Sequence, residues 1–589
     1  MAYNSYKEDE KSVEKSKIQT LKRLLSYLLK YKWTIVLVLM LMGYCVVVSL
    51  INPLIIESAI DNHIGNKDYI GLYKLLIIAL IINLIATFAI KLRMYIMAKM
   101  CNQILLTIRQ ELYTHIQKLG FKFFDSRPTG KILSRIIGDI NSLKDVLSNC
   151  VTTLIPDFIT VCAVVIIMFS KNPKLAVAAL ISTPFMAIAI TMIQVKAHPR
   201  WQTFRKKSSN LNAFLHEDMS GMKIIHSFTA EKETEETFDE LLNEHKSSFR
   251  SAVRLSDCFG SVIDFSWGFG CVALYFIGIV VLKDENISVG TFLAFGTYIN
   301  MFWQPINNLS NFYNQITTNI AGAERIFEIL DTKPEIEDEK GVVDLPDIKG
   351  EVTFDHVTFG YDEEKVLDDV SFVIKPGETI AIVGPTGAGK STIINLISRF
   401  YDANEGRVLL DGYDVKDVSI ESLRKQVGTM TQENFIFSGT VKDNIRYGKL
   451  DATDEEIIEA AKAVNAHEFI MKLDKGYDTE LLERGGGLSI GQKQILALAR
   501  TMVSKPKILI LDEATSSIDT KTELIVQKGI DKLLSGRTSF VIAHRLSTIK
   551  KADRIFVVDN GKIIEEGNHR QLLEKKGAYY NLYMAQFNI

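Results

Sequence analysis

The stretch that decides the fold of the second half of the chain reads GPTGAGKS and spans residues 384–391. It matches the pattern GxxxxGK[ST], in which a glycine-rich loop turns its backbone N–H groups toward phosphate oxygens. An apolar strand is expected just before it, over 379–383, and an apolar helix just after it, over 392–400. The N-terminus of that helix adds a favourable site for negative charge. The stretch therefore predicts an α/β domain that binds a nucleotide through its phosphates.

The positions of this loop have separate expected roles. Lys390 is expected to neutralise charge on the β- and γ-phosphates, and Ser391 to ligate Mg²⁺. We expect ATP to contact the loop and the start of the following helix, at Gly384, Pro385, Thr386, Gly387, Ala388, Gly389, Lys390, Ser391 and Thr392. The implied cofactors are therefore ATP and Mg²⁺.

A second pattern, ILILD over 508–512, is an apolar run typical of a buried strand that ends in an acid. Asp512 is expected to hold Mg²⁺ through its water shell, and Glu513 to orient or polarise the water that attacks the γ-phosphate. Parallel strands often end in acids, so the pattern is weak alone. The glycine-rich loop earlier in the same domain makes it specific.

A third pattern, LSIGQ over 488–492, opens a predicted helix. Ser489 is a good N-cap residue, so the turn has a plain structural explanation. The same turn is also a possible anion-binding helix terminus. Its position shortly before the ILILD strand favours the second interpretation.

The first 325 residues contain six long apolar runs of low charge, at 33–54, 72–90, 150–169, 175–195, 261–282 and 288–309. Each is about the 20 residues that a helix needs to cross a bilayer. Six such runs in one half of the chain make the buried helices of a soluble domain a poor explanation. We expect a multi-pass membrane domain, and no cleaved signal peptide, because the first 32 residues are polar and basic.

The connections between the runs differ in charge, which predicts their sidedness. The short connections carry one, two and one Lys or Arg, whereas the long ones, 91–149 and 196–260, carry ten each. The positive-inside rule then places the basic N-terminus and both long connections in the cytoplasm. Within the N-terminal segment, leucines at 21, 24, 25 and 28 are interleaved with Lys22, Arg23 and Lys30, which predicts an interfacial helix.

The composition supports a two-part protein. A formal net charge of −2 over 589 residues argues against a nucleic-acid partner, and 47% apolar residues exclude a disordered chain. The acidic segment 331–350, with Pro334 and Pro346, is typical of a linker. We predict a helical membrane domain of six transmembrane helices with long cytoplasmic extensions (1–330), a linker (331–350) and an α/β P-loop NTPase domain (351–589) that begins with a strand over 352–359.

These motifs in this order resemble those of the ATP-binding cassette (ABC) exporter family, of the multidrug and lipid type, over essentially the whole chain. ILILDE resembles its Walker B motif and LSIGQ its signature motif, which contacts the ATP held by the other subunit. Tyr361 resembles the adenine-stacking aromatic, Gln432 the Q-loop glutamine and His544 the switch histidine. The resemblance implies that Glu513, His544 and Gln432 are catalytic and that Ser391, Gln432 and Asp512 bind the metal. It further assigns the signature to Leu488, Ser489, Ile490, Gly491 and Gln492, and the D-loop to Ser516, Ser517, Ile518 and Asp519.

The membrane half resembles the same family. FFDSRPTGKILSRIIGDI (123–140) is similar to its first cytoplasmic loop, and EDMSGMKIIHSFTAE (217–231) to its second. In the family these loops carry short coupling helices that contact the nucleotide-binding domains. Both are also compatible with ordinary amphipathic helices. The resemblance implies an exporter in a cell membrane that works as a dimer of half-transporters by alternating access.

Ile490 departs from the family signature, which is usually LSGGQ. A glycine there lets the backbone approach the γ-phosphate closely, whereas isoleucine adds bulk and stiffness. We expect a weakened phosphate clamp, as in members that pair with a different half-transporter and have one degenerate ATP site. The alternative is a homodimer that tolerates isoleucine.

The substrate is the least determined feature. Asp157 and Asp264 are acids at predicted membrane depth, where acids are functional candidates. They are expected to favour cationic amphiphiles, or else to pair with Lys or Arg or to form hydrogen bonds between helices. Three functions remain open: export of amphiphilic drugs or lipids, export of a peptide or other dedicated cargo, and a membrane-bound ATPase that regulates without transport. The absence of a preceding cysteine-protease domain disfavours leader-cleaving peptide exporters, and the residue usage suggests a bacterial source.

Overall fold

The computed structural model describes residues 17–282, 287–338, 341–361, 364–431, 434–513, 520–543 and 546–587. It divides into two compact units. The helical unit comprises Met1–Gln117 and Thr129–Thr332, and the α/β unit comprises Lys118–Pro128 and Lys333–Ile589. Each unit has its own apolar core.

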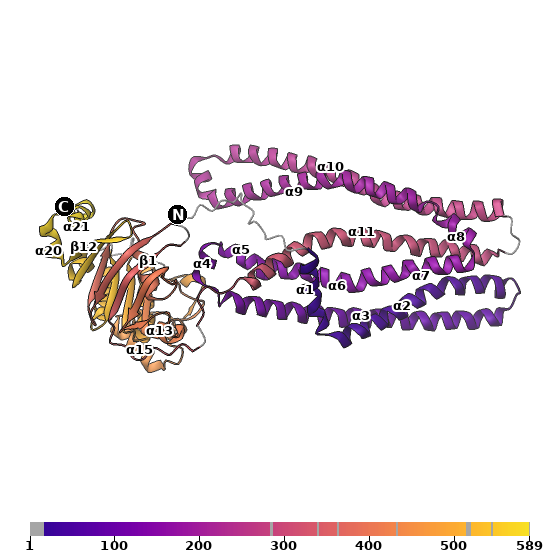
Figure 1. Cartoon of the computed structure of the whole chain (residues 1–589). Coiled ribbons are helices and arrows are strands. Elements are labelled where there is room, and N and C mark those ends of the chain that lie inside the picture. Colours follow the sequence, from indigo (N-terminus) through magenta and orange to yellow (C-terminus); the bar gives the residue numbers. More distant parts are fainter. Residues whose placement is uncertain are drawn as a thin grey trace. The chain divides into compact units, whose positions relative to one another are not determined.

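The helical unit is built from long helices with short connections (Figure 1). Its elements are α1 (Lys17–Leu29), α2 (Lys32–Ser58), η1 (Ala59–Ile64), α3 (Tyr69–Ile116), α5 (Thr129–Ser134), η2 (Arg135–Asp139), α6 (Ile140–Asn149), η3 (Cys150–Leu154), α7 (Ile155–Lys171), α8 (Pro173–Leu180), α9 (Thr183–Phe228), α10 (Glu231–Phe276), η4 (Ile277–Leu282) and α11 (Val289–Asp331), where η1 to η4 are π-helical turns. Figure 1 shows α9 and α10 running side by side as a long antiparallel pair.

Five helical stretches of the described residues are long and apolar enough to cross a membrane: Lys32–Ile64, Tyr69–Ile116, Thr129–Lys171, Pro173–Phe228 and Glu231–Val280. They contain four of the six predicted runs in full and all but the last two residues of a fifth, 261–282. The sixth, 288–309, begins just before α11 and continues into its first half. The helices extend well beyond the apolar runs. Hydropathy locates only the part of a helix that contacts lipid. The polar residues that follow remain helical, so each helix is longer than its apolar run.

The core of the helical unit lies between α2, α7, α8, α10 and α11 and includes Phe295, Tyr298 and Trp303. Gly270 of α10 lies against α8 so closely that a Cβ there would come within 2.8 Å of the Ala179 carbonyl. The predicted interfacial helix forms as α1. Its Leu24 and Leu28 are buried, so protein covers part of the face that the sequence assigns to the membrane interface.

The α/β unit contains two larger sheets. The strands are β1 (Val352–Phe359), β2 (Leu367–Ile374), β3 (Thr379–Val383), β4 (Glu405–Leu410), β5 (Tyr413–Asp414), β6 (Val427–Met430), β7 (Gly439–Thr440), β8 (Glu480–Leu481), β9 (Ile508–Glu513), β10 (Thr538–Ala543), β11 (Arg554–Asp559) and β12 (Lys562–Gly567). One sheet has the order β2-β1-β4-β5 and is antiparallel, and the other has the order β12-β11-β3-β10-β9-β6 and is parallel except for β12. The β7–β8 pair is separate.

Helices cover this unit: α4 (Phe121–Asp125), α12 (Lys390–Ile397), α13 (Ile420–Gln426), α14 (Val441–Arg446), α15 (Asp454–Ala463), α16 (His467–Ile470), η5 (Gly476–Asp478), η6 (Glu483–Gly485), α17 (Ile490–Val503), α18 (Thr520–Leu534), α19 (Leu546–Lys551), α20 (His569–Lys575) and α21 (Ala578–Phe587). The parallel sheet is buried on both faces, since successive side chains of a strand point to opposite sides. In β3, Ile380 and Ile382 belong to one apolar core, and Ala381 and Val383 belong to the other.

The segment predicted as a linker is bound to the α/β unit. Leu345 and Ile348 are buried in its core, and their backbone N–H groups donate to Ser422 and Gln426. Asp411 accepts hydrogen bonds from the backbone N–H groups of residues 349–351. This part of the chain is therefore a fixed edge of the domain.

Candidate functional site

The parallel sheet brings the predicted motifs to one edge. Strands β3, β10, β9 and β6 run parallel, so their carboxyl ends meet at the same side of the sheet. The glycine-rich loop follows β3, and Asp512 and Glu513 end β9. In open α/β sheets, ligands bind at this carboxyl edge.

The loop itself has the backbone that its glycines require. Gly384, Gly387 and Gly389 all have positive φ, at 154°, 84° and 104°. A Cβ at Gly384 would lie 2.0 Å from the Val558 carbonyl, and one at Gly389 would lie 2.8 Å from the Leu367 side chain. The loop between these glycines is exposed at Pro385 and Thr386. It is therefore tightly held at both ends and open in the middle, where a phosphate chain has room to bind.

Lys390 is the first residue of α12, two residues before the predicted start of that helix. Its Nζ donates to the backbone carbonyls of Gly384 at 2.9 Å and Pro385 at 2.7 Å. Burial lowers the pKa of the Lys390 amine, and the nearby negative charge of Asp512 partly opposes this effect. The amine thus lies over the loop with Asp512 close by.

The donor set at this edge fits Mg²⁺. Ser391 is exposed in the first turn of α12, and Asp512 is half-buried at the end of β9. Hydroxyl, carboxylate and phosphate oxygens are the ligands that Mg²⁺ prefers. The third predicted ligand, Gln432, lies outside the described residues.

Tyr361 packs beside the loop. Its ring meets Phe359 and Tyr401 edge-on, with centroids 5.0 Å away in both cases. Its hydroxyl lies 3.3 Å from the Thr392 hydroxyl, and Asn395 donates to it at 3.4 Å. The ring is half-buried, so it combines strand-end packing with a position next to α12.

The LSIGQ stretch forms the start of α17. Ser489 is the N-cap: its hydroxyl accepts from the Gln492 N–H at 3.2 Å, and its own N–H donates to Gln492 Oε1 at 2.9 Å. Ile490 is the first helical residue and its side chain is 58% exposed. Since the backbone at 490 is helical, isoleucine causes no strain there, and only its added bulk remains as a possible obstacle.

Several predicted residues lie outside the described ranges: Gln432, His544 and the D-loop residues Ser516, Ser517, Ile518 and Asp519. In the sequence, Gln432 follows β6 by two residues and His544 directly follows β10. Their predicted roles remain predictions, as does the catalytic role of Glu513.

The first predicted coupling segment begins with α4, which belongs to the α/β unit. Phe121 packs on Phe400 with ring centroids 4.5 Å apart, and Phe123 is buried. The Tyr401 hydroxyl donates a hydrogen bond to Asp125. Nothing local in the sequence marks Phe400 and Tyr401 as partners of residues nearly 280 positions earlier, so sequence reasoning missed them.

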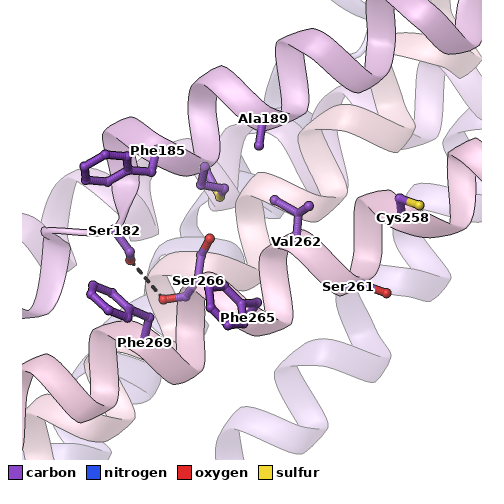
Figure 2. Close-up of a pocket in the computed structure, with 10 residues that line it drawn as sticks. Ser182, Phe185, Ala189, Cys258, Ser261, Val262, Phe265, Ser266 and Phe269 are labelled. Atoms are coloured by element: carbon purple, nitrogen blue, oxygen red, sulfur yellow. Dashed lines mark hydrogen bonds between the residues drawn. The ribbon is translucent and has the colours of Figure 1, made fainter.

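The helical unit has an apolar cavity of about 670 Å³ between α9 and α10. Figure 2 shows Phe185, Phe265 and Phe269 around the hydrogen bond of 2.9 Å that Ser182 donates to the Ser266 carbonyl. None of the lining residues, all of them described, has a charged side chain. A cavity of this kind suits the apolar part of a ligand.

The two predicted membrane acids differ. Asp157 lines a cavity between α7 and α11 and accepts a hydrogen bond of 3.0 Å from Asn308. Asp264 is exposed on α10 and has no hydrogen-bond or ion-pair partner among the described residues. Asn308 is a further residue that sequence reasoning missed, because an asparagine in an apolar run gives no signal of its partner.

Comparisons with known proteins identify both units. The family model described as "ABC transporter transmembrane region" matches residues 33–306, and the model "ABC transporter" matches residues 367–516. The chain is 42% identical to an uncharacterized ABC transporter ATP-binding protein of Bacillus subtilis, YknV, over 96% of this chain and 94% of that protein. It is 39% identical to the ATP-dependent lipid A-core flippase of Syntrophus aciditrophicus, over 82% of this chain and 81% of that protein.

The fold agrees with a solved structure. A bacterial Atm1-family ABC exporter with ATP bound superposes with a TM-score of 0.79 at 28% identity, covering 95% of this chain and 99% of that one. The chain belongs to the ABC transporter family, as a multi-pass membrane exporter of the multidrug and lipid type whose ATPase domain is fused to its transmembrane domain and coupled to transport.

Proposed function

We propose that this chain is one half of a dimer that uses ATP hydrolysis to move amphiphilic small molecules or lipids out of a bacterial cell by alternating access. The observation that carries the proposal is the carboxyl edge of the parallel sheet. There a glycine-rich loop, the amine of Lys390 and the carboxylate of Asp512 lie together, in the arrangement that binds and hydrolyses a nucleotide.

The residues at this edge take complementary roles. Lys390 leaves the loop carbonyls to contact the β- and γ-phosphates, while loop N–H groups bind the remaining phosphate oxygens. Ser391 and Asp512, with Gln432, hold Mg²⁺, which neutralises phosphate charge. Tyr361 stacks on adenine, and Glu513 orients the attacking water with His544 near the γ-phosphate.

The distribution of Lys and Arg along the membrane half indicates which parts of the chain face the cytoplasm. The N-terminus and the α/β unit lie in the cytoplasm, because the long helix extensions and the first 32 residues carry most of the Lys and Arg of the membrane half. The ends of α2 and α7 and the start of α11 then lie outside. The apolar cavity between α9 and α10 supports an amphiphilic cargo, since its lining suits a hydrocarbon or aromatic group.

Two segments support coupling within a dimer. α4 is bound to the α/β unit of its own chain, through Phe121 and Asp125. The C-terminal end of α9, next to the turn into α10, exposes Ile224 and Phe228, the latter by 79%. Exposed apolar side chains at the tip of a polar helix pair suit a protein partner, and the second subunit supplies one.

The partner is a different half-transporter rather than a second copy. Ile490 extends from the helix terminus that faces the partner's ATP, and its bulk hinders close approach of the γ-phosphate. This chain then contributes Lys390 and Glu513 to the site completed by an intact partner signature. Its own LSIGQ covers the weaker site. A homodimer is the alternative.

The test is the ATPase rate of the purified chain in lipid, beside Glu513→Gln. Negligible turnover in a folded, ATP-binding sample supports the heterodimer, whereas turnover that depends on Glu513 supports the homodimer. Equal ATPase in the wild type and Glu513→Gln contradicts the catalytic role of Glu513. Uptake of a fluorescent amphiphile into inverted vesicles tests export itself.

A further inference from the structure

A small cavity in the helical unit combines an acid with an apolar wall. It lies between α7 and α11 and has a volume of about 230 Å³. Leu154, Phe158, Val161 and Ile306 supply the apolar wall. Asp157 and Asn308 face each other in the same lining, from α7 and α11. The size suits one head group and the first atoms of a chain, rather than a whole drug-sized molecule.

The acid in this cavity is oriented but not neutralised. Asn308 Nδ2 donates to Asp157 Oδ2 at 3.0 Å, which fixes the carboxyl group. Among the described residues, neither Lys nor Arg forms an ion pair with Asp157, although such a pair was one of its expected explanations. A carboxyl group that is held by one neutral amide retains an oxygen for a further partner.

Asp157 lies at membrane depth, where a carboxyl group without a basic partner is unusual. Asp157 precedes Lys171, at the end of α7, by 14 residues, which is about 21 Å along a helix axis. The hydrocarbon core is about 30 Å thick, so Asp157 lies within it in the proposed topology. Acids at such depth are costly and mark substrate or ion pathways.

Both helices are locally irregular at the cavity. The π-helical turn η3 ends at Leu154, directly before α7, whose second residue is Pro156, and Pro305 lies inside α11. Proline lacks an N–H and cannot complete the helical hydrogen bond, and π-helical turns are frequent at functional sites. These irregularities occur where Asp157 and Asn308 meet.

From this geometry we propose that the α7–α11 cavity binds the positively charged head group of an amphiphile, with Asp157 as its counter-ion and Asn308 as the residue that positions it. The inference rests on the proposed export function and names the substrate class of that exporter. The α9–α10 cavity has an uncharged lining and gives no such selectivity. Asp264 lies outside both cavities and serves as the matched control.

The experiment compares two probes that differ by one group: trimethylammonium-diphenylhexatriene and uncharged diphenylhexatriene. Binding to the full chain in nanodiscs is followed by energy transfer from tryptophan, with empty nanodiscs as the blank. We expect Asp157→Asn to weaken binding of the cationic probe at least about tenfold, as loss of a charged partner does. Binding of the uncharged probe is expected to stay unchanged, and Asp264→Asn to leave both probes unchanged.

Two results overturn the proposal. One is equal affinity of the wild type and Asp157→Asn for the cationic probe, which would assign Asp157 to a hydrogen bond between helices. The other is an equal loss for both probes, which would indicate a structural defect. If Asp157→Asn does not fold, Asp157→Glu replaces it: retained preference for the cation supports the proposal, and lost preference in a folded protein contradicts it.

Asn308→Ala tests whether Asn308 positions the carboxyl group of Asp157, separately from the binding of the cation by Asp157. It keeps the charge of Asp157, so we expect a smaller loss of cation affinity than in Asp157→Asn and a reduced but retained preference for the cationic probe. Affinity unchanged from wild type removes Asn308 from the proposal. Export is scored apart from binding, by ATP-dependent uptake of both probes into vesicles. Wild-type vesicles that take up neither probe contradict the proposed function, while the binding comparison still decides the inference.

Discussion

The hydroxyl of Tyr401 in the α/β unit donates a hydrogen bond to the carboxylate of Asp125, which ends α4. The Tyr401 ring also meets the Tyr361 ring edge-on at 5.0 Å, and the Tyr361 hydroxyl lies 3.3 Å from that of Thr392. Two tyrosines therefore connect the first predicted coupling segment to the helix that follows the phosphate loop. This is a continuous physical path between the ATP site and the segment that leads into the membrane helices.

The hydrogen bond between Tyr401 and Asp125 is one of several contacts that hold α4. Burial and the negative charge of Asp125 raise the pKa of the Tyr401 hydroxyl well above its usual range, so the hydroxyl stays a donor at physiological pH. Phe121 packs on Phe400 beside it, and the Arg424 guanidinium lies 5.1 Å from the Phe400 ring centre. α4 is thus held to the α/β unit by both apolar and polar contacts.

Removing the Tyr401 hydroxyl should lower the amount of substrate transported per ATP more than it lowers the ATPase rate. Tyr401→Phe keeps the ring against Tyr361 but loses a hydrogen bond worth about 1 kcal/mol. We expect transport per ATP to fall about fivefold, with ATPase within about twofold of the wild type. The measurement is ATPase and vesicle uptake on the same preparation.

Tyr579→Phe is the control for this variant, because it also removes a tyrosine hydroxyl with a hydrogen-bond partner, His569, at 2.6 Å in the same unit. It should leave the ratio of transport to ATPase unchanged. A Tyr401→Phe protein with the wild-type ratio would show that α4 is coupled through its apolar contacts alone.

Lys390→Ala should weaken nucleotide binding. The variant loses the amine that now bonds the carbonyls of Gly384 and Pro385 and that is expected to reach the phosphates. We expect the Kd for ATP to rise at least about tenfold, with ATPase at background. Lys528→Ala, an exposed lysine on α18, is the control and should bind ATP normally. ATP affinity unchanged in Lys390→Ala would contradict the role of this loop.

The sequence predicted the local secondary structure around this site well. The limits of β1 and β3 agree with the expected 352–359 and 379–383 to the residue, because β1 alternates apolar and polar residues, β3 is a short apolar run, and glycines flank both strands. The predicted start of α12, Thr392, lies two residues after the observed start, Lys390, because the apolar pattern begins after the polar Lys-Ser pair that opens the helix.

Contacts between distant segments were beyond sequence reasoning. Asp157 was recognised as unusual from its apolar surroundings, but Asn308 lies 151 residues away and nothing local pairs the two. The same holds for Asp125 and Tyr401, which are 276 residues apart. For Ile490 the sequence suggested two obstacles, bulk and backbone stiffness, and the helical conformation at this position removes the second.

If side-chain bulk and not backbone stiffness is the obstacle at Ile490, the effect of changing this residue can be predicted. If bulk limits the signature, Ile490→Gly and Ile490→Ala should raise the ATPase of the chain alone several-fold, whereas Ile490→Leu should behave like the wild type. Thermal unfolding should change little, because the side chain is 58% exposed. Equal ATPase in all four proteins would show that the signature tolerates isoleucine, which favours the homodimer.

The proposed outer end of the helical unit is joined by polar contacts. Lys171 of α7 forms an ion pair of 2.5 Å with Glu57 of α2, and Glu57 also accepts from Thr291 of α11 at 2.9 Å. Asp61 accepts hydrogen bonds from Ser288 and from the N–H of Gly290. A Cβ at Gly290 would lie 2.5 Å from the Asp61 carboxylate, so the two segments are in close contact. The apolar core of the unit lies further from this end. Ion pairs and hydrogen bonds that are exposed to water contribute little free energy, so the ends of these helices can separate at low cost.

Locking this end should therefore stop export. In a background without native cysteines, Glu57→Cys/Thr291→Cys puts one thiol on each of two residues whose side-chain oxygens now lie 2.9 Å apart. We expect oxidation to reduce uptake to background and reduction to restore it, because outward opening requires α2 and α11 to separate.

Asn52→Cys/Asn83→Cys is the control: these side chains are 3.1 Å apart on α2 and α3, consecutive helices that a short turn joins. Its disulfide should leave uptake intact, since that helix pair moves as one body. Full uptake by the oxidised Glu57→Cys/Thr291→Cys protein, with cross-linking verified on a gel, would show that α2 and α11 of one chain stay together and that the exit opens between subunits instead.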